Sequence, residues 1–261
     1  MDALDRMAER LHAEGRPRVW SLIVTAFGDV AAPRRAPLSA ARLTALMAPA
    51  GIGGGAVRTA LSRLVADGLL IRERIGHASL HRPSPALAAD ILAATPLIYR
   101  PPSKAWELSF GDRPPRALAV APSAWLSREA AAEAPLRFAA APLSTAALDD
   151  GRALEPAHAG ALDALDDEIA DLAEPPAEPL RAAAARLLLV HRWRRLVLRW
   201  PQVEPGWLPR GIADPRPRVM ERLERLRGPS DAWWDAGIGP GLAGSALSGR
   251  PGGRFGDKGR D

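Results

Sequence analysis

The sequence predicts an α+β fold that is mostly helical, and three patterns indicate it. Residues 51–83 read as a helix, a glycine stop and two short strands. Residues 106–110 and 116–121 have the character of short strands. Residues 180–200 carry apolar side chains at helical spacing. We therefore expect an N-terminal unit of helices and a hairpin, a small α+β middle unit and a helical C-terminal domain.

The N-terminal unit begins with a short charged helix at residues 3–15, which we expect to form an arm. Residues 17–30 are apolar almost throughout and predict the first core helix. Ser39 is a suitable N-cap for the next helix, and Pro49 and Gly51 end it. Three apolar side chains of that helix are expected to face inward: Leu43, Leu46 and Met47.

The following helix comes after three glycines at residues 53–55, which are costly for helix initiation, so we expect its first turn to be frayed or loop-like until DNA is bound. One side of this helix is an apolar stripe formed by Val57, Leu61, Leu64 and Val65. The opposite face carries two cations and two small hydroxyls: Arg58, Thr59, Ser62 and Arg63. Arginine pairs bidentately with guanine, and small hydroxyls reach phosphates or base edges without blocking close approach. These four residues are the candidate DNA-reading side chains, and a solvated charged face is the alternative interpretation.

A hairpin is predicted directly after this helix. Gly68 stands where a helix C-cap is expected, Gly76 marks a turn, and Leu80 lies on the returning strand. Five side chains of the hairpin can reach DNA phosphates: Arg72, Arg74, His77, His81 and Arg82. A recognition helix followed by such a hairpin forms a winged helix-turn-helix, which places the helix in the DNA major groove. We therefore predict double-stranded DNA as the partner of this unit.

Charge is distributed unevenly along the 261 residues, whose formal net charge is +5. Residues 1–85 have a net charge of +5, residues 86–180 of −8 and residues 181–227 of +8. The basic N-terminal block suits phosphate neutralisation. We predict four segments, which are a DNA-binding unit (1–85), a small α+β unit (86–150), a helical C-terminal domain (151–236) and a disordered tail (237–261).

The C-terminal domain contains an acidic and a basic helix. In the acidic helix at residues 159–173 we expect the carboxylates to be solvated: Asp163, Asp166, Asp167, Glu168 and Asp171. In the basic helix, Arg192, Arg195 and Arg199 form a ridge, and His191 lies beside it. The ridge either binds the phosphates of a coenzyme A thioester or pairs with the acidic helix or a partner subunit. We favour the pairing.

Motifs for catalysis or metal binding are not found in the sequence. It has no cysteine, which excludes disulfides and thiolate zinc sites. Its five histidines are scattered, and no HExxH, GxSxG or P-loop pattern occurs. The N-terminus has no signal-peptide pattern, and no apolar run is long enough to span a membrane. We expect a cytoplasmic protein that is not an enzyme and holds no cofactor or metal.

Two blocks of the sequence resemble a known family. SLIVTAFGD, followed by the GI…VRTALSRLVADGLL segment and its hairpin, looks like the N-terminal winged helix of PaaX-type repressors of phenylacetic acid degradation. The block RLLLVHRWRRLVLRWPQVEPGWLP is similar to their C-terminal domain. The resemblance implies a ferredoxin-like middle unit, which is shortened here because residues 111–148 are rich in alanine and proline. It also implies a homodimer that binds an inverted repeat near a promoter and is released by phenylacetyl-coenzyme A.

Three functions follow from these observations. The first is a ligand-responsive transcriptional repressor of the PaaX type, with an acyl-coenzyme A as its effector. The second is a winged helix kept for protein interaction, without sequence-specific DNA binding. The third is an enzyme that acts on an acyl-coenzyme A through the arginine ridge, and the sequence lacks a nucleophile–base pair for it.

Overall fold

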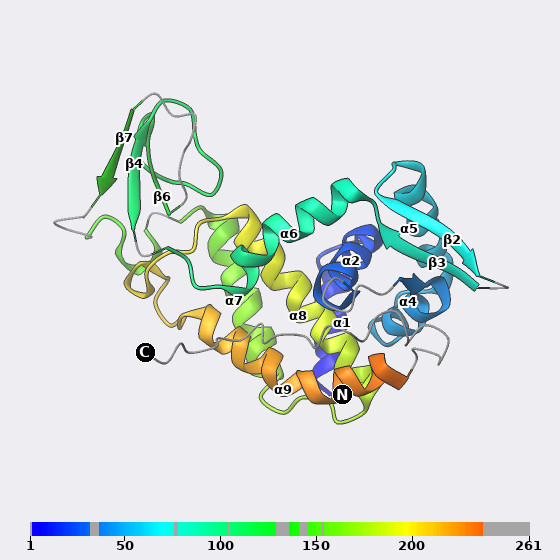
Figure 1. Ribbon diagram of the computed structural model, residues 1–261. Helices are drawn as coiled ribbons and strands as arrows, with labels where there is room; N and C mark the ends of the chain where they lie inside the picture. Colours follow the sequence, from blue (N-terminus) through cyan, green and yellow to red (C-terminus); the bar gives the residue numbers. More distant parts are fainter. Residues whose placement is uncertain are drawn as a thin grey trace, which may run out of the picture. The chain divides into compact units, whose positions relative to one another are not determined.

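The computed structural model (Figure 1) describes residues 2–31, 37–75, 78–103, 105–128, 136–140, 146–152 and 154–236. The described chain is mostly helical with two small antiparallel sheets, as expected for the α+β class. It forms two compact units. The first comprises described residues of 1–95, 171–191 and 220–261, and the second those of 96–170 and 192–219. The four predicted segments remain a prediction, and the predicted tail at 237–261 lies outside the described residues.

The first unit begins with helix α1 (Ala3–Ala13), and the prediction that this helix is an arm is wrong. Asp2 and Asp5 form a capping box at its start, and Leu4 and Met7 are fully buried. Arg6 and Arg10 of α1 form ion pairs with Asp171. At the start of the helix, Asp2 and Asp5 form ion pairs with Arg181. Burial and ion pairing hold α1 against the unit.

The next elements are α2 (Val19–Ala26), a π-helical turn (Phe27–Ala31), α4 (Ala40–Met47), a 3₁₀ turn (Ala48–Ala50) and α5 (Gly54–Ala66). The predicted cap of α4 is confirmed, because the Ser39 hydroxyl accepts from the Arg42 backbone N–H at 3.1 Å. The predicted end is also confirmed, since Gly51 adopts the left-handed conformation with φ 74°. The loop-like first turn expected for α5 is wrong, because the helix begins at Gly54.

A three-stranded antiparallel sheet completes this part of the unit, with the order β1-β3-β2. Its strands are β1 (Leu38–Ser39), β2 (Leu70–Ile75) and β3 (Ala78–Pro83). Helix α5 ends in a Schellman motif before β2 begins. The Leu69 N–H donates to Leu64 O at 2.9 Å, and the Gly68 N–H donates to Val65 O at 3.1 Å. The predicted turn at Gly76 lies outside the described residues.

The second unit contains a four-stranded antiparallel sheet with the order β5-β6-β4-β7. The strands are β4 (Trp106–Phe110), β5 (Leu118–Ala121), β6 (Ala124–Ser127) and β7 (Leu136–Ala140). Because β4 and β5 are both antiparallel to the strand between them, they run parallel to each other, as in a split β-α-β unit. The described connection at 111–117 contains no helix. This arrangement fits the shortened ferredoxin-like unit, which remains a prediction.

Four further helices are α6 (Pro85–Tyr99), α7 (Pro156–Asp171), α8 (Pro179–Arg199) and α9 (Pro215–Ala236), and two 3₁₀ turns lie at Asp149–Gly151 and Pro205–Trp207. Helix α6 continues past Pro96, and Ile98 and Tyr99 beyond it are buried. The acidic helix α7 has a buried apolar stripe formed by Leu162, Leu165 and Ile169. Within the described residues, no helix has the length and apolar character needed to cross a membrane.

Candidate nucleic-acid interface

Helix α5 presents one buried and one exposed face. Val57, Ala60, Leu61 and Leu64 are at most 7% exposed and face α2 and α4. The four predicted DNA-reading residues are all exposed, and at helical spacing they lie opposite that stripe: Arg58, Thr59, Ser62 and Arg63. The structure therefore brings the predicted cations and hydroxyls together on one solvent-facing surface, which we call the α5 outer face.

The three glycines before this face differ in their surroundings. A Cβ on Gly54 would lie 3.0 Å from Thr44 Cγ2 and 3.3 Å from Arg58 Nη1. Gly54 therefore permits the close packing of α5 on α4. A Cβ on Gly53 or Gly55 would meet no atom of the described residues within 4 Å. These two glycines leave the N-terminus of α5 open to solvent, where its backbone N–H groups favour an anion.

The hairpin cations lie on two different faces of the sheet. In the register of β2 and β3, Arg72 pairs with His81 and Arg74 with Ser79, whereas Arg82 pairs with Ile71. Side chains alternate along a strand and cross-strand partners share a face, so Arg72 and Arg74 lie on one face and Arg82 on the other. The Arg72 Nε donates to Ser79 Oγ at 2.8 Å.

Arg82 has a carboxylate partner on its own face of the hairpin. Its Nε lies 2.6 Å from Glu73 Oε1, and the two side chains are 48% and 46% exposed. An exposed pair of this kind is weak, but the carboxylate neutralises the charge that would attract a phosphate. Arg82 is therefore a weaker phosphate candidate than the sequence predicts.

The prediction that His81 is available to DNA phosphates is corrected by the structure, because the side chain is only 4% exposed. Burial lowers the pKa of His81, and a hydrogen bond with the Leu38 backbone partly opposes that shift. Leu38 belongs to β1, which pairs with β3 at this position. The short strand β1 was not predicted, and it helps to bury the imidazole. His77 lies outside the described residues.

These elements coincide with a family match. Residues 18–86 match the family described as PaaX-like protein. The match confirms the predicted resemblance over this segment, which holds α2, α4, α5 and the hairpin. No curated protein matches the chain. The similarity of the block around α8 to the C-terminal domain of the family remains a prediction.

Outside the PaaX-like segment, the arginine ridge of α8 is not one continuous surface. The Arg192 Nη2 lies 2.8 Å from Glu168 Oε1, and the two side chains are 13% and 3% exposed. The prediction that Glu168 is solvated is therefore wrong. Arg195 and Arg199 are exposed, and the Arg199 guanidinium lies 4.5 Å from the Trp200 ring centroid. Arg192 thus has the partner on the acidic helix that the pairing interpretation expects.

His191 is buried rather than placed on the ridge. It is 5% exposed, and its Nδ1 lies 3.1 Å from Thr25 Oγ1 on α2. Five residues earlier on α8, Arg186 donates two hydrogen bonds to Asp29, with Nε–Oδ2 at 2.7 Å and Nη2–Oδ1 at 3.0 Å. These buried polar contacts join α8 to the PaaX-like segment. These contacts could not be predicted from the sequence, because the partner residues are more than 150 residues apart.

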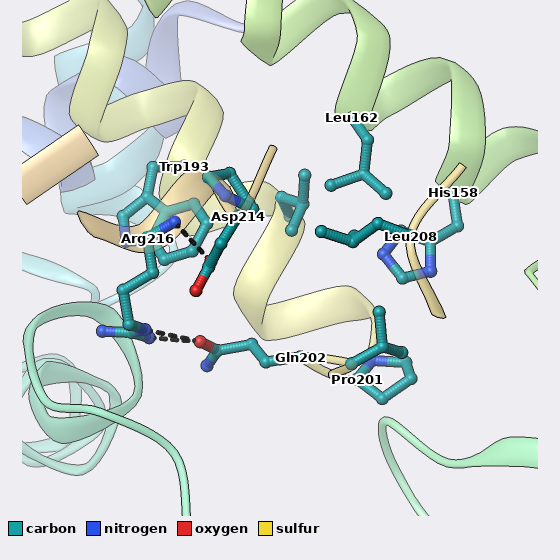
Figure 2. A pocket seen from close by; sticks show the side chains of 11 residues that line it. His158, Leu162, Trp193, Pro201, Gln202, Leu208, Asp214 and Arg216 are labelled. Atoms are coloured by element: carbon teal, nitrogen blue, oxygen red, sulfur yellow. Dashed lines mark hydrogen bonds between the residues drawn. The ribbon is translucent and has the colours of Figure 1, made fainter. Parts of the chain in front are cut away.

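The second unit contains a small cavity of about 30 Å³ (Figure 2). His158, Trp193 and Arg216 are among its lining residues. Arg216 donates to Gln202 Oε1 at 2.7 Å and to the Leu97 carbonyl at 2.8 Å, and burial lowers its pKa to about 10. A volume of this size holds about two water molecules, whereas a cavity that binds benzene is about 150 Å³. The cavity is therefore too small for an aromatic acyl group.

Proposed function

We propose that the protein is a DNA-binding transcriptional regulator without catalytic activity, and that it acts as a repressor. The observation that carries this proposal is the α5 outer face within a segment that matches the PaaX-like family. In a winged helix-turn-helix, the second helix enters the major groove and the hairpin contacts the backbone. Arg58 and Arg63 then read base edges, and Thr59 and Ser62 allow the helix to approach closely.

Two further features support α5 as the reading helix. Its N-cap Gly53 and its second residue Gly55 carry no side chain, and none of the described residues has an atom within 4 Å of where their Cβ would lie. A phosphate can therefore approach the backbone N–H groups at the helix N-terminus. Arg72 and Arg74 share one face of the hairpin and supply the phosphate contacts of the wing.

We further propose a homodimer that binds two half-sites and an acyl-coenzyme A, such as phenylacetyl-coenzyme A, that releases it. The resemblance to PaaX-type repressors supports both statements. A symmetric dimer requires half-sites about 10 base pairs apart, or a multiple of that distance. The exposed Arg195 and Arg199 remain the candidates for the coenzyme A phosphates, since Arg192 is paired with Glu168.

Fluorescence anisotropy tests this proposal directly. The purified chain is titrated onto DNA from its own upstream region and onto scrambled DNA, and phenylacetyl-coenzyme A is then added. We expect a preference for the upstream DNA of about a thousandfold and release by the thioester. Preference without release discards the effector and keeps the regulator. The absence of any preference overturns the proposal and favours the protein-interaction module.

Three variants assign the roles of the arginines. Arg58→Ala and Arg63→Ala are expected to cost about 1–3 kcal/mol on upstream DNA and to relax the sequence preference. Arg210→Ala is the matched control, because it also removes one charge and the side chain is 83% exposed in the second unit. Equal losses on upstream and scrambled DNA would show that Arg58 and Arg63 contact phosphates rather than bases.

A further inference from the structure

We propose that the C-terminal end of α9 is a latch on the helix-turn-helix, and that Arg42 is the positioning residue through which it acts. The inference rests on the proposed DNA-binding function. It concerns four residues of the first unit, Arg42, Thr44, Trp233 and Trp234, of which the last two lie far outside the PaaX-like segment. None of them belongs to the α5 outer face.

The contact joins the first turn of α4 to the last turn of α9. The Arg42 Nη2 donates to the carbonyl of Trp233 and, at 2.9 Å, to that of Trp234. Helix α9 ends at Ala236, and the last four carbonyls of a helix have no partner within the helix. Arg42 therefore caps α9, and its positive charge lies at the negative end of the helix dipole.

The rings of Trp233 and Trp234 also contact the Arg42 guanidinium. The guanidinium carbon, Arg42 Cζ, lies 4.1 Å from the Trp233 ring centroid and 5.4 Å from the Trp234 ring centroid. The two tryptophan rings pack edge to face, with their centroids 4.6 Å apart. Trp234 is 3% exposed. Burial lowers the pKa of Arg42, and the charge of Asp235 opposes that shift. Arg42 therefore contacts other parts of the protein and is not a candidate for contact with DNA.

Helix α4 passes this constraint to the reading helix. Thr44 lies on α4 two residues after Arg42, and its methyl group occupies the space beside Gly54 that a Cβ would need. Helices α4 and α5 are therefore closely packed and can shift little relative to each other, because a Cβ on Gly54 would lie only 3.0 Å from that methyl group. Fixing α4 against the end of α9 consequently fixes the orientation of the α5 outer face.

The test compares Arg42→Ala and Arg42→Lys on upstream and scrambled DNA over a range of salt concentrations. Lysine keeps the charge but cannot reproduce the stacked, two-carbonyl contact. We expect both variants to lose about tenfold or more in affinity for upstream DNA, with an unchanged salt slope. If Arg42→Lys binds like the wild type and Arg42→Ala lowers the slope by about one, Arg42 contacts a phosphate and the latch is wrong.

Trp233→Leu tests the other side of the latch and also serves if an Arg42 variant does not fold. The losses caused by Trp233→Leu and Arg42→Ala are expected to be non-additive, because both variants remove the contact between the Arg42 guanidinium and the Trp233 ring. Additive losses, or wild-type binding by the single variants, overturn the proposal. Arg210→Ala again controls for the loss of a surface charge.

Hydrogen exchange separates this inference from the proposed function. If the wild type shows no preference for its upstream DNA, the DNA-binding function fails, but the latch is still tested by amide exchange in residues 40–47. Faster exchange there in Arg42→Ala supports the latch. Unchanged exchange in those residues shows that the end of α9 does not hold α4, and this overturns the latch.

Discussion

Gly54 and Gly55 are neighbours in α5, and we predict that they respond differently to an added methyl group. Gly55→Ala should raise the free energy of unfolding by about 1 kcal/mol, because alanine is the better helix former and the site is open. At Gly54 the same methyl lies 3.0 Å from Thr44 Cγ2, so part or all of that gain is lost. Urea denaturation of both variants measures the difference, and equal gains would contradict the α4–α5 packing.

Gly55→Ala also separates stability from function. If the open N-terminus of α5 accepts a phosphate, the added methyl group should weaken DNA binding while the fold becomes more stable. A variant that is both more stable and fully active would leave Gly55 without a role in DNA binding.

We predict that His158 makes the stability of the second unit sensitive to acid. It is 2% exposed and stacks on Trp200 with ring centroids 5.1 Å apart. Burial lowers its pKa to about 4 from an ordinary 6.5, and the charge of Glu155 opposes that shift. Between these two values the unfolded chain binds more protons than the folded chain, so stability is complete above pH 6.5 and falls as the pH decreases toward 4.

His158→Gln is predicted to reduce this pH dependence, which amounts to about 3 kcal/mol for the wild type. The measurement is urea denaturation at pH 7.5, 6, 5 and 4.5. His81 is also buried with a lowered pKa, so a remaining slope in the variant is expected. A slope equal to that of the wild type would mean that folding does not lower the pKa of His158.

At the scale of elements, the sequence predicts what local patterning determines. The apolar stripe of α5 predicts the helix, and Gly68 predicts where it ends and the following strand begins. Both are local signals, because one is a 3.6-residue period and the other is a glycine in the left-handed conformation. Strand β1 has only two residues, which is too few to show alternation. Its pairing with β3 buries His81, so the exposure of that histidine could not be predicted from its own strand.

The acidic helix α7 shows the same limit. Its apolar stripe predicts the buried face, but Glu168 is buried as well, because Arg192 of another helix pairs with it. A carboxylate is buried only where a partner compensates it, and that partner lies 24 residues away. Spacing within one helix cannot show which distant arginine will face it.

The two faces of the hairpin are predicted to differ in DNA binding. Arg72→Ala and Arg74→Ala should each weaken binding to all DNA sequences similarly and reduce the salt slope by about one. Arg82→Ala should change neither value appreciably, because this side chain lies on the other face and pairs with Glu73. Salt titrations of the three variants on scrambled DNA provide the measurement. A larger effect of Arg82→Ala than of Arg74→Ala would reverse the assignment of the faces.

At the scale of the whole molecule, the PaaX-like segment makes buried polar contacts with residues outside it. Asp29 within it is buried and bonded to Arg186, and Thr25 is bonded to His191. Residues 18–86 alone would leave the Asp29 carboxylate without its guanidinium and expose the side chains that α1, α8 and α9 cover. We predict that the isolated fragment lacks the cooperative unfolding transition of the full chain.

Circular dichroism and urea denaturation of the fragment and of the full chain test this prediction. Asp29→Asn in the full chain is the matched comparison, because it removes the same ion pair without truncation and should cost about 3–5 kcal/mol. A fragment that unfolds cooperatively with the stability of the full chain would show that the added helices are dispensable.

The first unit draws its residues from the beginning, the middle and the end of the chain. Synthesis proceeds from the N-terminus at about 5–20 residues per second, so the reading helix leaves the ribosome long before Arg186, and Arg186 before Trp234. Contacts of such high sequence separation also slow folding. If α9 holds the proposed DNA-reading surface in place, that surface takes its final form only after α9 has been synthesised, and we expect a translation product that stops before α9 to bind DNA more weakly than the full chain.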